Sequence, residues 1–133
     1  MGALLTVELV AITLDITGAG VGYTNLVGGF LELVGYTKPS APSPPELDEI
    51  PDVITVLVTT ETSGKTLWSQ ASVGASAVVR PRATQHNTLG VEYEAADGLP
   101  ILSPILIEGE RVKVAVTGGS PGSIETFRVV VVL

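Results

Sequence analysis

The carboxy-terminal stretch Ile124-Glu125-Thr126-Phe127-Arg128-Val129-Val130-Val131-Val132-Leu133 decides the fold class. Its first half alternates as a half-buried strand does, with Phe127 on one face and Thr126 and Arg128 on the other. Residues 129–133 are apolar on both faces. Such a run is typical of a central strand that is covered on two sides.

The two faces of this stretch predict different neighbours. We expect one face to be the core side of a sandwich, namely Phe127, Val129, Val131 and Leu133. Val130 and Val132 point the other way, and the chain has few helical signals that could provide a cover for them. We therefore expect another sheet or another copy of the chain to cover these two valines, which makes them candidate interface residues.

Strand signals recur through the rest of the chain. Residues 4–17 favour a long strand whose apolar face changes after Leu9, as a β-bulge or a strand crossing between sheets would produce. Residues 23–37 favour a strand bent at Gly28 and Gly29. Further strands are expected at 53–62, 66–72, 75–83, 88–95 and 111–117, with an edge or irregular segment at 99–107. We expect loops or turns at 18–22, 63–65, 97–98, 108–110 and 118–122.

This spacing predicts an all-β fold, an antiparallel β-sandwich of jelly-roll type with an extended proline-rich arm. We expect a single domain over residues 1–133, with amino-terminal strands at 1–37, the arm at 38–51 and the main sandwich at 52–133. The arm contains Pro42, Pro44 and Pro45, which exclude a helix or a central strand. It is either a linker or an arm that lies across a neighbouring subunit, and its prolines are candidate interface residues.

The composition indicates which partners to expect. Only 16% of residues are charged, against about 25% in an average domain, so we expect apolar surface to be buried against other subunits. The net charge of -7 argues against nucleic acid as the main partner. No apolar segment approaches the roughly 18 residues of a membrane-spanning helix, and no secretory signal is visible. We expect neither membrane nor nucleic acid among the partners.

Candidate catalytic motifs do not survive inspection. Residues 118–122 fit the nucleophile elbow G-x-S-x-G, but Pro121 lacks the N–H that the oxyanion hole needs. Residues 62–66 match the end of a phosphate-binding loop, but Thr59 stands where its first glycine should be. His86 has no nucleophile or carboxylate placed beside it by a motif, and we interpret it as a loop residue.

Paired carboxylates are equally weak evidence for a site. Glu92 and Glu94 share one strand face, which is commonplace, and Glu108 and Glu110 lack the further oxygen ligands that calcium needs. We expect no enzymatic activity, no cofactor and no metal ion.

Three further side chains are candidates for an interface. Trp68 is the single tryptophan, and with aromatic residues at 5% it favours core or interface packing over sugar stacking. Arg80 and Arg82 flank Pro81 on one side of a strand, where they either are solvated or pair with acids of a neighbouring subunit.

The second half of the chain resembles a known family. Residues 80–84 (RPRAT), 106–114 (LIEGERVKV) and 118–122 (GGSPG) before a terminal strand are similar to small jelly-roll head decoration (cement) proteins of tailed bacteriophages. The resemblance covers residues 52–133. It implies a homotrimer on the capsid surface that contacts the major capsid protein.

The function expected from the sequence is therefore structural. We expect a non-enzymatic virion protein, a capsid decoration protein that bridges capsid subunits. The alternative is a receptor- or glycan-binding β-sandwich module of a fibre or adhesin, which would need an exposed aromatic or carboxylate-lined cleft.

Overall fold

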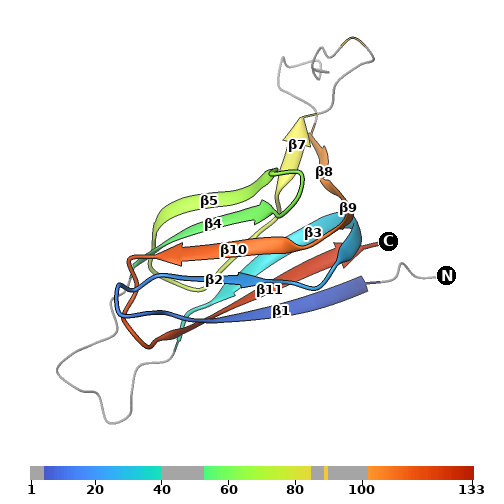
Figure 1. Ribbon diagram of the computed structural model, residues 1–133. Coiled ribbons are helices and arrows are strands. Elements are labelled where there is room, and N and C mark those ends of the chain that lie inside the picture. Colours follow the sequence, from blue (N-terminus) through green and yellow to red (C-terminus); the bar gives the residue numbers. More distant parts are fainter. Residues whose placement is uncertain (1–4, 40–52, 85–88, 90–101) are drawn as a thin grey trace, which may run out of the picture.

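The computed structural model describes residues 5–39, 53–84, 89 and 102–133, which form strands and turns without a helix (Figure 1). Most of the proline-rich arm, including Pro42, Pro44 and Pro45, lies outside these residues, as do His86, Glu92 and Glu94. The strands are β1 Leu5–Thr13, β2 Gly20–Tyr23, β3 Val27–Thr37, β4 Ile54–Thr60, β5 Thr66–Val73, β6 Ala77–Val79, β7 Arg82–Thr84, β8 Leu102–Pro104, β9 Leu106–Glu110, β10 Val112–Thr117 and β11 Ile124–Val132.

Two antiparallel sheets form the two layers of a sandwich-like fold (Figure 1). Sheet A has the strand order β1-β11-β3-β6, and β9 also pairs with β3, whereas sheet B has the order β2-β10-β4-β5. β7 and β8 form a separate ribbon that projects beyond the two layers (Figure 1). The expected all-β class and antiparallel sandwich-like architecture are confirmed.

The carboxy-terminal strand is central in sheet A. β11 lies between β1 and β3, so that Val130 faces Val7 on one side and Leu33 on the other. β1 and β3 belong to sheet A and β2 to sheet B. The amino-terminal strands are therefore interleaved with the carboxy-terminal ones in both layers.

The core lies between the sheets around the fully buried ring of Phe127. The ring of Tyr36 stacks on it at a centroid distance of 5.0 Å, and Trp68 meets it edge-on at 6.5 Å. Burying a side chain of this size contributes about 1.5–3 kcal/mol. Val129 and Val131 are also fully buried, as expected. Leu133 is not in the core: it follows the last residue of β11 and is 67% exposed.

The change of apolar face in the first strand has a different cause from the one expected. β1 pairs with β11 in unbroken register from Leu5 to Thr13, so no bulge or crossing occurs there. Val10 and Ile12 point into the core, whereas Val7 and Leu9 point out of the sandwich. The first half of β1 therefore places its apolar residues on the outer face of sheet A.

Two segments expected to be loops are strands. Residues 20–23 form β2, and Gly20 and Gly22 are needed because an added Cβ would lie 2.5 Å from the side chains of Ile12 and Val10. Residues 108–110 belong to β9, where Gly109 at φ +62° occupies an irregularity in the pairing with β3. The expected bend in the third strand is present, with Gly29 at φ +128°.

Candidate interaction surface

The outer face of sheet A carries apolar side chains on every strand, together with Thr13, Thr37, Thr126 and Arg128. Side chains of directly paired residues share one face of a sheet, so the register assigns the members of this face. We call this set the apolar face. It comprises Leu5, Val7 and Leu9 of β1, Phe30 and Leu33 of β3, Val78 of β6, Leu106 of β9, and Ile124, Val130 and Val132 of β11.

The outer face of sheet B differs in composition. It carries Val21, Tyr23 and Leu57, but these lie among Thr55, Thr59, Ser69, Lys113 and Thr117. A contiguous apolar surface marks an interaction site more often than scattered apolar residues do. The apolar face is therefore the candidate site of the described chain.

The two valines predicted as interface residues lie in this face. Val130 is only 7% exposed, because Val7 and Leu33 flank it within the sheet. Val132 lies between Leu5 and Phe30 and is partly exposed. The direct contact surface is thus provided more by the neighbours of Val130 than by Val130 itself. An interface role for both valines stays a prediction.

The free edge of β1 adjoins the apolar face. No strand among the described residues pairs with β1 on the side away from β11. Edge strands of this length are usually protected by charges or bulges. β5, the edge of sheet B, has such an irregularity, with Ser72 at φ 57° and a register shift opposite β4. The register of β1 shows none.

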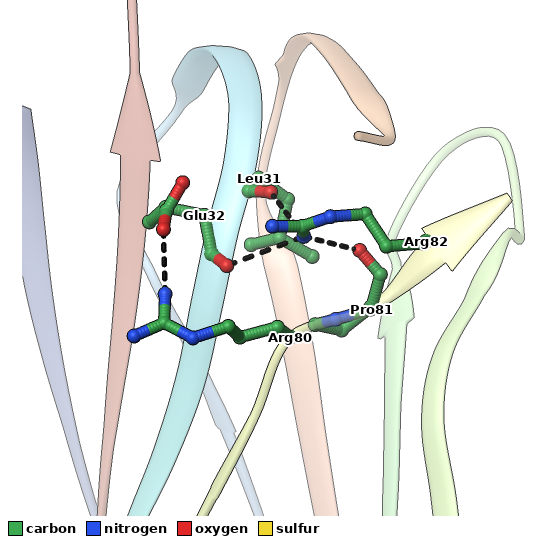
Figure 2. Close-up of polar contacts among 5 residues, drawn as sticks. All are labelled: Leu31, Glu32, Arg80, Pro81 and Arg82. Atoms are coloured by element: carbon green, nitrogen blue, oxygen red, sulfur yellow. Dashed lines mark hydrogen bonds and ion pairs between the residues drawn. The ribbon is translucent and has the colours of Figure 1, made fainter. Parts of the chain in front are cut away.

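Arg80 and Arg82 both bind β3 of their own chain (Figure 2). The Arg80 guanidinium forms an ion pair with Glu32, with 2.5 Å between Nη1 and Oε1. Nη1 of Arg82 donates to the carbonyl oxygens of Pro81, Glu32 and Leu31 at 2.7, 3.4 and 3.5 Å. Glu32 is the extra residue where the pairing of β3 with β11 shifts register. The two arginines therefore hold this irregularity, and their contact with another subunit stays a prediction.

Trp68 belongs to the core rather than to the surface. It is buried, it packs against Phe127, and its Nε1 donates to Oε1 of Gln70 at 3.0 Å. Its position agrees with the core alternative stated for it above. It is not available on the described surface as a platform for a ligand.

A shallow hollow lies on the apolar face at Gly35. Leu9, Arg128, Gly35 and Val78 are consecutive partners across four strands, and they line a volume of about 190 Å³. The Arg128 guanidinium lies over the glycine, since a Cβ built there would be 3.7 Å from its Nε and Nη2. We call this site the Gly35 hollow.

Two buried carboxylates serve the fold. Glu110 accepts the backbone N–H groups of Thr62 and Ser63 at 2.9 and 3.0 Å and the Ser63 hydroxyl at 2.8 Å, which ties the β9–β10 corner to the β4–β5 turn. The Ser63 backbone N–H is the main cause that lowers the pKa of Glu110, although burial acts in the opposite direction. The described residues contain no group of three or more acidic or histidine side chains that could hold a metal ion.

Glu125 is the second buried carboxylate, on the inner face of β11. Oε2 accepts the Tyr36 hydroxyl at 2.6 Å, and Oε1 accepts the Ser123 hydroxyl at 3.2 Å. Burial raises the pKa of Tyr36, and the hydrogen bond and negative charge of Glu125 raise it further. The pair therefore satisfies two polar groups within an apolar core.

Comparison of the chain with protein-family models, with curated proteins and with solved structures found no match. The family resemblance thus stays a prediction. Among the described residues, no helix is long and apolar enough to cross a membrane.

The sequence predicts two residues of the apolar face and does not predict most of the others. Val130 and Val132 were identified because their strand is apolar on both sides. Leu5, Val7 and Leu9 give a signal as well, the change of face after Leu9, but this signal predicts a β-bulge or a strand crossing between sheets. The missed residues are the more exposed ones: Leu9 is 71% exposed.

The first prediction concerns the buried Tyr36–Glu125 pair. Tyr36→Phe leaves Oε2 of Glu125 without its donor, so we expect the free energy of unfolding to fall by about 1–3 kcal/mol in urea denaturation. Tyr23→Phe removes a hydroxyl from the exposed outer face of sheet B and serves as the matched control. Equal stability of the two variants would contradict a structural role for the pair.

The second prediction concerns acid stability. Because the folded chain lowers the pKa of Glu110, its ionised carboxylate stabilises the fold above the ordinary pKa, and this contribution is lost as the pH falls through the lower, folded-state pKa. We expect the melting temperature of Glu110→Gln to lie below wild type near neutral pH and to converge with it once the pH has fallen below the lowered pKa of Glu110. Glu61→Gln, an exposed neighbour of the same turn, should follow wild type throughout; a constant offset for Glu110→Gln would contradict the linkage.

Proposed function

We propose that the chain is a non-enzymatic structural protein of a virion, a capsid decoration (cement) protein that sits on the capsid surface and bridges capsid subunits. The observation that carries the proposal is the apolar face, which lies on one sheet, is contiguous except for Ile124, and adjoins an edge of β1 that no described strand pairs with. A surface of this kind is stabilised when another protein covers it. In an assembly, a neighbouring subunit covers such a surface permanently.

The strand order supports a sandwich of jelly-roll type. When β6 and β9 are taken as one strand position beside β3, and the β7–β8 ribbon is set aside, eight positions remain in chain order. The sheets then read 1-8-3-6 and 2-7-4-5. This is the order of one long hairpin, with strand pairs 1–8, 2–7, 3–6 and 4–5, that has been rolled up. Pairs 1–8 and 3–6 form one sheet, and pairs 2–7 and 4–5 form the other. Viral capsid domains are among the proteins with jelly-roll folds, although a fold by itself does not assign a function.

The partners proposed for the chain are a further copy of itself and the major capsid protein. The resemblance implies a homotrimer. Low charge content and the net charge of -7 favour protein partners over nucleic acid. A glycan-binding module is less well supported, because the exposed aromatic rings of the described residues, Tyr23 and Phe30, lie on opposite sheets and cannot form one platform.

A matched pair of substitutions tests the proposed attachment. Val7 on the apolar face and Val21 on the outer face of sheet B are both edge-strand valines, 51% and 52% exposed. In Val7→Asp a carboxylate must be desolvated when the apolar face is covered, so we expect occupancy on capsids of the virus that carries the chain to fall at least about tenfold. The measurement is the amount of protein bound per particle after reconstitution.

Val21→Asp should retain wild-type occupancy, since it carries the same change on the other sheet. Circular dichroism and urea denaturation establish that both variants fold. Wild-type occupancy for Val7→Asp, or equal losses for the two variants, would refute the dependence of capsid occupancy on burial of the apolar face. A wild-type protein that does not bind capsids at all would refute the proposed function.

A further inference from the structure

Arg128 and Glu108 are charged side chains on the outer face of sheet A that form no ion pair with the described residues. Arg128 projects from β11 in the row of Leu9 and Gly35. Glu108 follows Leu106 on the same side of β9 and is exposed. Within the described residues, neither makes a salt bridge or a side-chain hydrogen bond. Charges inside a surface that becomes buried need partners of opposite sign, because desolvating an unpaired charge is costly.

The two charges are too far apart to pair within one chain. Glu108 follows Ile107, the partner of Gly29, and Arg128 pairs with Gly35, so about six residues of β3 separate them, on the order of 20 Å at about 3.3 Å per residue. The apolar face therefore has an acidic end and a basic end. The charges of such a face are complementary to those of a second copy that packs against it with its two ends exchanged.

Gly35 provides the space for such a contact. A glycine inside a strand weakens it and is usually required by an unusual dihedral angle or by close packing. Neither reason applies here: its φ is not in the left-handed region, and an added Cβ would meet its nearest atoms at an ordinary 3.7 Å. Gly29 and Gly22, in contrast, are required by dihedral angle and by packing respectively. What the glycine at position 35 does create is the hollow beside Arg128.

We propose that a second copy of this chain covers the apolar face in a two-fold pair, with Glu108 of each copy in the Gly35 hollow against Arg128 of the other. A two-fold axis lying between the two faces exchanges their ends, so each pair contains this contact twice. The surrounding apolar side chains exclude water and strengthen both ion pairs. The inference rests on the proposed function only in that the apolar face is buried in an assembly. It differs from the trimer that the resemblance implies.

Charge reversal tests the pairing in the purified full-length chain, by light scattering and sedimentation over a range of concentrations. Wild type should form a dimer. Arg128→Glu and Glu108→Arg each place like charges together twice, so we expect either variant alone to raise the dissociation constant by about a hundredfold or more. An equimolar mixture of the two restores both contacts and should give a heterodimer. The double variant restores both contacts between identical chains and should form a homodimer. Both side chains are exposed, so the variants should fold as wild type.

Filling the hollow is an independent test. Gly35→Val suits a strand and should leave the urea midpoint equal to or above that of wild type, but it should weaken dimerisation about tenfold or more by occupying the hollow. Ala115→Val, the same kind of enlargement on the outer face of sheet B, should not affect dimerisation.

A wild-type monomer, a trimer, or a dimer that neither reversal weakens would overturn the inference, as would an equimolar mixture that stays monomeric. The capsid occupancy of Val7→Asp is measured separately. The proposed function can therefore hold where the two-fold pair fails.

Discussion

Strand β11 is the constraint on which sheet A depends. Its backbone pairs with β1 on one side and β3 on the other, so its donors and acceptors are used in both directions. Phe127, Val129 and Val131 fix one of its faces in the core. Once these contacts are made, Val130 and Val132 must point outward. The apolar face is thus a consequence of pairing and core packing.

The sequence was sufficient to predict the class of fold, because a period of two along a strand survives in the residues themselves. It predicted the terminal strand, with Phe127, Val129 and Val131 in the core, and a strand at 53–62 where β4 lies. It could not predict which side of β1 faces the core. Alternation shows which residues share a face, but the identity of the buried face depends on register with a strand more than a hundred residues away. For this reason the sequence did not predict that Val7 and Leu9 point outward.

Side-chain contacts between distant segments were beyond sequence reasoning for a related cause. Arg80 and Arg82 bind a register irregularity in β3 that no local pattern announces. Glu125 occupies an inner position of β11 although it is charged. Its hydrogen-bond donor, Tyr36, is distant from it in the sequence. Such groups are tolerated inside only because their partners are present. A single sequence identifies the polar residues but does not indicate which distant residues are their hydrogen-bond or ion-pair partners.

The distribution of charge gives the apolar face its selectivity. A chain with a net charge of -7 repels its own copies at long range, which opposes the indiscriminate association that an exposed apolar strand edge invites. Association is favourable only where enough apolar surface is buried and the few local charges are matched. In the proposed two-fold pair, Arg128 and Glu108 lie where a reversed copy matches both charges. Apolar area supplies the attraction, and the two charges select the orientation.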